Sequence, residues 1–503
     1  MTTTQVTPDK TLYPPRWQPA PLRWHRTPVS WRQSWRLAVR GMPLRRDRTL
    51  AEFYGAQLPG QDDILVARMP LQRFVVIRNP EHARHILVTN QANYTKSAEY
   101  DMLAVAFGRG LVTELDEQRW QRNRRLVAPV FGKRNIATLS GPITDAAHDC
   151  AQRILQLGAR GASVDMNAEM SRLTLDIVAR TMFGLDLTGP MSEITLSRML
   201  RLFGVGFVAG TSRGLHALAE LTNRHDLPIR VMRSACWILA PRTVADLRHV
   251  EKVIDQLITD HRRGAITRRD NLLALLMDAQ DPETGHRYTD AEIHDELMTF
   301  IGAGTETTAT ALAWTWKLLG EHPDARTRLY AELDDVLGGR TPTTADVDLL
   351  PWTKAVVAET MRLYPPIVGL GRVAKTDDML GDFPVRAGTT VIVSLHALHH
   401  HSGVWADAGA FDPARYLTEN LTTTHRHAAL PFGAGKRMCV AHVFANTEAV
   451  LALATIAQHV EMNPATTTPI RPQFSFTGGP NGPVPMHIST RNNNTAASDA
   501  SRP

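Results

Sequence analysis

The segment Phe432-Gly433-Ala434-Gly435-Lys436-Arg437-Met438-Cys439 places a thiol at the end of a glycine-rich, cationic stretch. The apolar periodicity of residues 440–459 predicts a helix that begins directly after the cysteine. Backbone N–H groups at a helix start and the cations Lys436 and Arg437 both favour the thiolate form of Cys439. The two glycines allow a tight turn and the close approach of a flat ligand. We therefore interpret Cys439 as a candidate ligand.

A single thiolate on such a loop suits the axial position of an iron ion better than a zinc site, because zinc needs further Cys or His ligands at close spacing. A buried thiol in a turn remains an open alternative for the cysteine taken alone. The other two cysteines, Cys150 and Cys236, are interpreted as core residues. Three cysteines in 503 residues do not form a disulfide framework, which favours a reducing compartment.

Residues 290–321 form the longest candidate helix, which we expect to be capped by Asp290 and to end before Pro323. At 1.5 Å per residue this helix spans about 48 Å, the width of a whole domain. Gly302, Gly304 and a run of threonines weaken its interior, because glycine costs backbone entropy and threonine hydroxyls compete for backbone carbonyls. We therefore expect a local opening of the helix there. A kinked core helix with one partly buried glutamate is the alternative.

The remaining periodicity predicts a chain that is mainly α with a small β portion. Apolar residues at spacings of three and four predict further helices over 142–158, 165–184 and 246–264. Short apolar runs predict strands within 59–84 and near 382–395. Because no repeat or linker divides the chain, we expect one domain over 51–490, an N-terminal arm over 1–50 and a disordered tail over 491–503.

The N-terminal arm carries most of the basic charge. Residues 1–50 hold ten Lys/Arg and two Asp/Glu, whereas the whole chain has a net charge of +6. Arg32, Arg36 and Arg40 recur every four residues beside tryptophans, which suits weak contact with anionic lipid; packing of the arm along the domain is the simpler interpretation. We expect no nucleic-acid partner, because no base-reading motif is present. Without a signal peptide or a spanning segment, we expect a cytoplasmic protein, peripheral to the membrane if the arm binds lipid.

The segment Phe432–Cys439 resembles the haem-ligand loop Phe-x-x-Gly-x-Arg-x-Cys-x-Gly of the cytochrome P-450 haem-thiolate monooxygenases. Each fixed position up to the cysteine matches, whereas Ala441 stands where the family has glycine. Alanine is small and favours the helix, so we expect closer crowding beneath the ring and not loss of haem. Glu359-Thr360-Met361-Arg362 and Phe411–Tyr416, which includes Arg415, resemble two further family segments whose role is to support this loop.

This resemblance implies the cytochrome P-450 fold, with the long central helix lying across haem b (iron protoporphyrin IX). It implies that Cys439 is the axial ligand of the haem iron. Trp120-Gln121-Arg122-Asn123-Arg124 is similar to the family's Trp-x-x-x-Arg pair, which meets a haem propionate. Solvation of Arg124 among its neighbouring arginines is the alternative. The residues implied to contact the haem are Cys439, Trp120, Arg124, Arg372, Arg437, Phe432, Gly433 and Ala303.

The segment Ala303–Thr308 resembles the family's Ala/Gly-Gly-x-Asp/Glu-Thr-Thr/Ser segment. The resemblance implies that Glu306 relays protons from solvent and that Thr307 hydrogen-bonds the oxygen being activated. The implied reaction inserts one oxygen atom from O2 into a hydrophobic substrate, such as a fatty acid, sterol or terpenoid. The sequence has no flavin, dinucleotide or iron–sulfur motif, so the electrons must come from a ferredoxin or flavodoxin with its reductase.

Two surfaces follow from the same resemblance. A basic patch on the cysteine side is expected to steer an acidic redox partner. Its members are Arg122, Arg125, Lys133, Arg134 and Lys436. An apolar substrate pocket is expected from segments that the motifs do not fix. These are the 95–115 loop, residues 200–215, Ile301, Ile367-Val368 and residues 474–476.

Two other functions remain open at this point. The chain could be a haem-thiolate binding or gas-sensing protein without turnover, although Glu306 and Thr307 favour turnover. It could also be a helical scaffold without haem. The run His399-His400-His401 looks similar to a metal site, but three consecutive residues rarely converge on one ion, so we expect no metal there.

Overall fold

The computed structural model describes residues 63–69, 72–97, 99–184, 241–264, 271–474 and 477–491. The chain divides into two compact units. The sheet unit comprises the described residues up to Ser97 together with Met361–Cys439, and the helical unit comprises the described parts of Ala98–Thr360 and those from Val440 onward. The basic arm, Cys236 and the tail beyond Arg491 lie outside the described residues.

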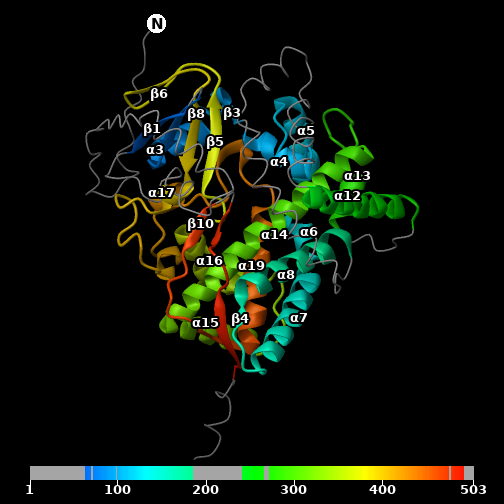
Figure 1. Ribbon diagram of the computed structural model, residues 1–503, viewed down its shortest axis with the longest axis vertical. Coiled ribbons are helices and arrows are strands. Elements are labelled where there is room, and N and C mark those ends of the chain that lie inside the picture. Colours follow the sequence, from blue (N-terminus) through cyan, green and yellow to red (C-terminus); the bar gives the residue numbers. More distant parts are fainter. Residues whose placement is uncertain are drawn as a thin grey trace, which may run out of the picture. The chain divides into compact units, whose positions relative to one another are not determined.

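A five-stranded sheet is the centre of the sheet unit (Figure 1). Its strand order is β1 (Ile64–Met69), β2 (Gln72–Ile77), β8 (Thr390–Ser394), β5 (Gly369–Ala374) and β3 (Tyr94–Lys96). Strands β2 and β8 pair in parallel, whereas the other neighbours pair antiparallel. On β2, Val75 and Ile77 pack in one apolar cluster while Phe74 and Val76 pack in another. Apolar side chains thus cover both faces of the strand, as a continuous apolar run predicts.

Short elements surround this sheet. They are α3 (Pro80–Arg84), the π-helix η2 (His85–Thr89), the 3-10 helix η3 (Gln91–Asn93), β6 (Asp378–Leu380), β7 (Phe383–Val385), α17 (Leu395–His399), η6 (Pro413–Tyr416), α18 (Thr423–Ala428) and η7 (Gly435–Arg437). The carboxylate of Asp378 accepts from Tyr94 Oη at 2.6 Å and from Asn90 Nδ2 at 3.0 Å. His85 Nε2 lies 2.9 Å from the same carboxylate. This polar cluster ties η2 to the β6–β7 hairpin.

Helix α14 (Asp290–Glu321) is the longest helix of the helical unit (Figure 1). Its predicted bounds are confirmed, but the N-cap is Thr289 and not Asp290. The Thr289 hydroxyl accepts the N–H of Glu292 at 3.3 Å, and the Glu292 carboxylate accepts the N–H of Thr289 at 2.9 Å. This capping box satisfies two terminal donors, which explains why the helix begins there.

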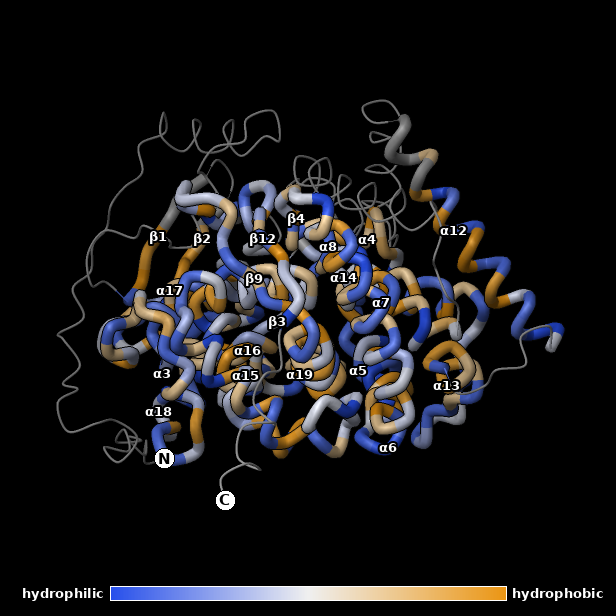
Figure 2. Tube along the Cα trace, turned by 90° about the horizontal axis from the view of Figure 1, so that it is seen from below, coloured by the Kyte–Doolittle hydropathy of each residue, from blue (hydrophilic) through white to orange (hydrophobic). Residues whose placement is uncertain are grey.

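The helical unit contains further helices besides α14. They are α4 (Glu99–Phe107), α5 (Glu117–Val127), α6 (Lys133–Ala137), α7 (Ser140–Gly158), α8 (Met166–Val178), the π-helix η4 (Ala179–Phe183), α12 (Pro241–Arg262), α13 (Leu272–Asp278), α15 (Pro323–Leu337), the 3-10 helix η5 (Val347–Leu349), α16 (Pro351–Leu363), part of which belongs to the sheet unit, and α19 (His442–His459). Helix α14 packs against α4, α8, α12, α13, α15 and α19. Apolar and polar residues alternate along α12 in Figure 2, and its buried side chains include Leu247, Val250, Ile254 and Ile258. The predicted helices over 142–158, 165–184 and 246–264 are thus confirmed to within a few residues.

The helical unit also contains two small sheets. One has the order β4 (Val164–Asp165), β12 (Pro485–Thr490) and β9 (Val460–Pro464), and the other is the hairpin of β10 (Pro472–Phe474) and β11 (Gly478–Pro480). The prediction of a mainly α chain with a small β portion is confirmed. None of the helices in the described ranges combines the length and the apolar character needed to cross a bilayer.

Candidate functional site

The cysteine loop of the sheet unit is closed by its own backbone. The N–H of Cys439 donates to the carbonyl of Phe432 at 2.9 Å, and the N–H of Met438 donates to that of Gly435 at 3.1 Å. The N–H of Lys436 donates to Gln91 Oε1 at 2.8 Å, which ties the loop to the η2–η3 segment. The thiol of Cys439 therefore projects from a fixed turn.

Both glycines of this loop have left-handed backbone conformations, with φ of +71° at Gly433 and at Gly435. A Cβ on Gly435 would lie 1.9 Å from the carbonyl oxygen of Leu87, and one on Gly433 would lie 3.3 Å from a methyl group of Leu370. The sequence explained both glycines by a tight turn and by the approach of a flat ligand, and the left-handed conformations confirm the tight turn. At Gly435 the structure gives a different reason, because the backbone of η2 occupies the space that a side chain would need.

The two described thiols differ in their surroundings. Cys150 on α7 is fully buried, and this burial raises the pKa of its thiol to about 12, so that it stays protonated and inert. Cys439 is partly exposed and unbridged. Its predicted place at a helix start is wrong, because α19 begins at His442 with Ala441 as its N-cap. Cys439 therefore lies in the loop, two residues before the N-cap of α19 in the chain.

Arg372 and Arg437 belong to the same unit as the cysteine. Arg437 lies on η7, within the cysteine loop. Arg372 lies on β5 and on the same face of that strand as Leu370, which packs at Gly433. Its side chain is buried, with 5% of its surface exposed, and its Nη1 donates to the carbonyl of Gly371 at 2.8 Å. Throughout the described ranges no carboxylate forms an ion pair with Arg372. A buried cation without a protein anion fits a ligand that carries carboxylates.

A partly exposed thiol, a loop without side chains at two positions and a buried cation fit the thiolate-ligated haem that the resemblance implies. Glu359 and Arg362, the predicted supporting pair, lie on α16 and are fully buried. The guanidinium of Arg362 donates to the carbonyls of His399, Ala408 and Ala410 at 2.7 to 3.0 Å. Arg362 therefore fixes chain segments of the sheet unit.

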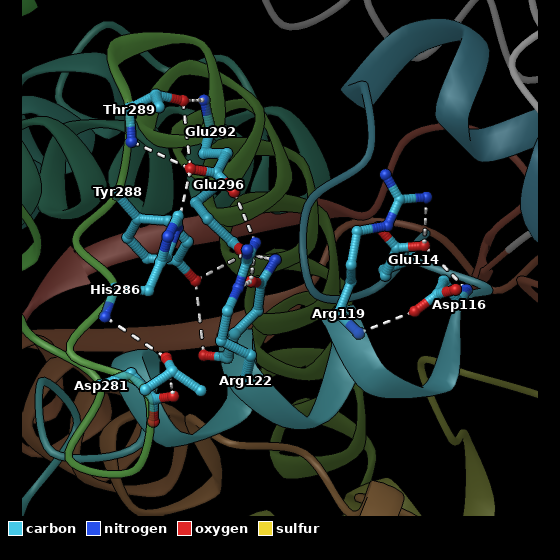
Figure 3. A network of polar contacts seen from close by, with 12 residues as sticks. Glu114, Asp116, Arg119, Arg122, Asp281, His286, Tyr288, Thr289, Glu292 and Glu296 are labelled. Carbon is cyan, nitrogen blue, oxygen red and sulfur yellow. Dashed lines mark hydrogen bonds and ion pairs between the residues drawn. The ribbon is translucent and has the colours of Figure 1, made fainter.

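The helical unit carries Trp120 and Arg124 one turn apart on α5, with Trp120 buried. A polar network holds α5 to α14 (Figure 3). The buried carboxylate of Glu296 accepts from Tyr288 Oη at 3.1 Å, from Asn123 Nδ2 at 3.3 Å and from the N–H of Leu111 at 2.9 Å. Burial and the neighbouring Glu296 raise the pKa of Tyr288, so its hydroxyl remains a neutral donor.

This network also changes the expected basic patch. Arg122 donates to Glu292, and the Nε and Nη2 of Arg125 donate to the two carboxylate oxygens of the buried Asp281 at 2.7 and 3.0 Å. These two arginines are engaged within the chain. Lys133 and Arg134 on α6 are exposed. The docking role of the patch stays a prediction, now centred on α6 within the helical unit.

Glu306 and Thr307 lie on α14. Glu306 Oε1 accepts from Thr477 Oγ1 at 3.0 Å, and burial raises the pKa of Glu306 although the Thr477 hydroxyl opposes the rise. The Thr307 hydroxyl donates to the carbonyl of Ala303 at 2.7 Å. Ala303 is exposed although Ile301 and Gly302 before it are buried. The face of α14 with Ala303 and Thr307 is therefore accessible.

The other threonines of this segment bond elsewhere. Thr305 donates to the carbonyl of Ile301 at 2.7 Å, and Thr308 Oγ1 lies 3.5 Å from the fully buried carboxyl of Glu448 on α19. The helix nevertheless runs unbroken from Asp290 to Glu321, so the predicted opening does not interrupt it. Gly302 has a packing reason, because a Cβ there would lie 2.2 Å from the ring of Phe107.

Sequence reasoning missed Thr477 and Glu448. Thr477 is separated from Glu306 by 171 residues, and no motif marks it. The predicted pocket segments are only partly described, because residues 200–215 and 475–476 lie outside the described residues. Of the histidine run, His399 is buried and its Nε2 accepts the N–H of Leu430 at 2.9 Å. The described residues contain no cluster of three or more metal-ligating side chains.

Comparisons with known proteins give a single family. The cytochrome P450 family profile matches residues 26–488. Cyclooctatin synthase of Streptomyces melanosporofaciens is 33% identical over 464 residues, which cover 89% of this chain and 94% of that protein. Cyclooctat-9-en-7-ol 5-monooxygenase of the same organism is 33% identical over 444 residues, covering 87% and 90%. The solved haem domain of cytochrome P450DA matches with a TM-score of 0.74 and 25% identity, over 89% of this chain and 93% of that domain.

These matches extend over nearly the whole chain and include the fold. They decide between the open functions, because relatives named as monooxygenases argue against a haem-free scaffold and against a sensor without turnover. The cofactor is accordingly a haem iron, and the reaction requires O2, an organic substrate and a source of electrons. The chain belongs to the cytochrome P450 family and is a cytochrome P450 monooxygenase.

Proposed function

We propose that this protein hydroxylates a terpenoid-type hydrocarbon skeleton, with Cys439 as the axial ligand of haem b and with electrons from a separate ferredoxin or flavodoxin. The observation that carries the proposal is the loop at Cys439, because it presents an unbridged, partly exposed thiol next to Arg437. A neutral, buried thiol such as that of Cys150 would not serve.

Cationic side chains and the closely approaching backbone of the cysteine loop would hold the haem. Arg372 and Arg437 of the sheet unit would bind its carboxylates. Trp120 and Arg124 on α5 remain haem contacts that only the sequence resemblance predicts. Arg372 supports this assignment best, since a carboxylate would neutralise its buried charge. When bound, a thiolate-ligated haem supplies the activation of dioxygen that transfers one oxygen atom to carbon.

The chain's own acid and alcohol would handle the protons. Burial raises the pKa of Glu306, which makes its protonated form, the one that can act as a donor, easier to populate than in an exposed glutamate. The Thr307 hydroxyl sits one residue further along α14 and needs only to leave the carbonyl of Ala303 to hydrogen-bond oxygen. Glu306 would then recover its proton from solvent water.

The substrate class is inferred from the pocket chemistry and from the relatives. Leu103, Val105, Phe107 and Ile301 are apolar and lie on α4 and α14 of the helical unit. The names of two relatives denote cyclooctatin and an unsaturated cyclic alcohol, which favours a terpenoid over a fatty acid or a sterol. Titrating candidate lipids and following the haem spin state would identify the ligand.

The central test replaces Cys439. We expect Cys439→Ser to lose the long-wavelength absorption of the reduced carbon monoxide complex and to lose hydroxylation, because a hydroxyl is a poorer donor to iron. Cys150→Ala is the matched control and should retain both. A Cys439→Ser protein with normal product formation would overturn the proposal.

The proton role is tested separately. Glu306→Gln keeps the size of the side chain but cannot release a proton, so we expect product formed per NADPH to fall and the rate of product formation to drop by roughly 100-fold, the lower range for loss of one general acid. Glu321→Gln, at the end of the same helix and paired with Lys317, is the control. Equal coupling in both variants would exclude Glu306 as the proton donor.

A further inference from the structure

We propose that Thr477 is a positioning residue that holds the carboxyl of Glu306 in place for proton delivery. The proposal rests on the function proposed for Glu306 and adds a residue that no motif indicates. Thr477 precedes β11 in the chain and belongs to the same unit as α14.

The contact between the two residues is direct and partly buried. Thr477 Oγ1 donates to Glu306 Oε1 at 3.0 Å, and Thr477 itself is only 5% exposed. Among the described residues, no lysine, arginine or histidine forms an ion pair with Glu306. A neutral hydroxyl therefore anchors the carboxyl where a salt bridge would otherwise be expected.

The hydroxyl is fixed by the strand that follows it. Trp314 Nε1 donates to the carbonyl of Gly478 at 2.9 Å. A Cβ on Gly479 would lie 3.6 Å from the hydroxyl of Thr310. Glu306, Thr310 and Trp314 are spaced by four residues and so share one face of α14. Residues 477–479 are thus held along this face, and the place of the Thr477 hydroxyl is set by the backbone.

A hydroxyl is the partner that a proton donor needs. A guanidinium or ammonium beside Glu306 would keep the carboxyl ionised and would prevent donation at neutral pH. A hydroxyl can donate to the carboxylate and can accept from the protonated acid, so it supports both states of the transfer. The hydrogen bond also lowers the pKa of Glu306 against the effect of burial, which keeps proton release accessible.

The test removes and restores the hydroxyl. Thr477→Val preserves the branched shape but cannot hydrogen-bond, whereas Thr477→Ser keeps the hydroxyl. Thr315→Val is the matched control, because Thr315 is buried on α14 and its hydroxyl donates to the carbonyl of Ala311 at 2.8 Å, away from Glu306. All variants are tested with haem bound, and their haem content confirms that they are folded. If Thr477→Val does not fold, Thr477→Ala replaces it.

Two measurements are made on each protein. The first is product per NADPH, which we expect to fall by a factor of roughly 2 to 10 in Thr477→Val, the range set by one net hydrogen bond. The second is the infrared titration of the Glu306 carboxyl, identified by its absence in Glu306→Gln, which does not depend on turnover. We expect its midpoint to shift to higher pH in Thr477→Val and to return in Thr477→Ser.

The outcomes separate the two proposals. If Glu306→Gln leaves coupling unchanged, the proton role of Glu306 fails. If Glu306→Gln lowers coupling while Thr477→Val changes neither coupling nor the infrared midpoint, only the role of Thr477 is overturned. An unrestored midpoint in Thr477→Ser, or an equal shift in Thr315→Val, also overturns it, because the hydroxyl at residue 477 would then not be the cause.

Discussion

Replacing Gly435 with alanine tests how closely the cysteine loop lies against η2. The new methyl group would lie 1.9 Å from the carbonyl oxygen of Leu87 and 2.8 Å from Gln91 Oε1. Ordinary contacts between carbon and oxygen exceed 3 Å, so either the loop or the backbone of η2 must move by more than 1 Å. Because Gln91 also accepts the N–H of Lys436, this movement would strain the segment that ends at Cys439.

The magnitude has two parts. An alanine at a φ of +71° costs about 1 to 2 kcal/mol, and overpacking against a fixed backbone adds about 1 to 3 kcal/mol. Gly388→Ala is the matched control, since Gly388 lies in the same unit at a φ of +75° with nothing within 4 Å of the added methyl group. It therefore carries the conformational cost alone.

The assay combines urea unfolding with haem content and the spectrum of the reduced carbon monoxide complex. We expect Gly435→Ala to lose about 1 to 3 kcal/mol more unfolding free energy than Gly388→Ala, which is the overpacking cost alone, and to retain less thiolate-ligated haem. Equal losses in the two variants, with a full thiolate spectrum in both, would refute the steric reasoning.

Three other predictions concern single groups. Arg372→Leu should release haem to an acceptor protein several-fold faster than wild type, because the variant lacks the buried cation that pairs with no described carboxylate. Arg386→Leu, on the exposed surface, is the control. Haem release from Arg372→Leu at the wild-type rate would exclude Arg372 as a haem anchor. Burial lowers the pKa of His399 to about 3, and it lowers the pKa of His396 and His400 below the usual value. Below pH 6.5 these histidines are therefore protonated in the unfolded chain but stay neutral in the folded chain. Unfolding free energy measured in urea should fall as the pH falls below 6.5, by at most about 1.4 kcal/mol per pH unit for each of these histidines, and a flat profile down to pH 5 would contradict this. Lys133→Glu should slow reduction by an acidic ferredoxin at low salt more than at high salt, whereas a rate independent of salt would exclude α6 as a docking surface.

Local patterns predicted the elements and the motifs well. The apolar spacing of residues 290–321 predicted α14 to the residue, and the glycine-rich segment predicted a turn that ends at Cys439. The N-cap was misplaced by one residue because Thr289 and Asp290 are both capping residues, and only the bond between Thr289 and Glu292 decides between them. The start of α19 was misplaced for a similar reason, since the turn η7 precedes it.

Contacts distant in sequence could not be predicted in this way. The clash that explains Gly435 comes from Leu87, and the partner of Arg125 is Asp281, which lies 156 residues away. The resemblance and the charges predicted that Arg122 and Arg125 belong to a docking patch, but neither could show that Glu292 and Asp281 already bind them. For the same reason, the sequence could not predict the contact between Thr477 and Glu306.

The surroundings of Glu306 illustrate why the partner of a side chain matters more than its type. In water a glutamate is ionised at neutral pH and has no proton to give. Burial in the helical unit raises the pKa of Glu306, and among the described residues no basic side chain opposes that rise, so the side chain takes up a proton more readily than an exposed glutamate. Releasing the proton creates a buried carboxylate, which is costly unless a donor stabilises it. The hydroxyl of Thr477 is such a donor, and because it is neutral it does not hold Glu306 in the ionised form. The motif at Ala303–Thr308 would therefore be incomplete as a proton path without Thr477, which precedes β11.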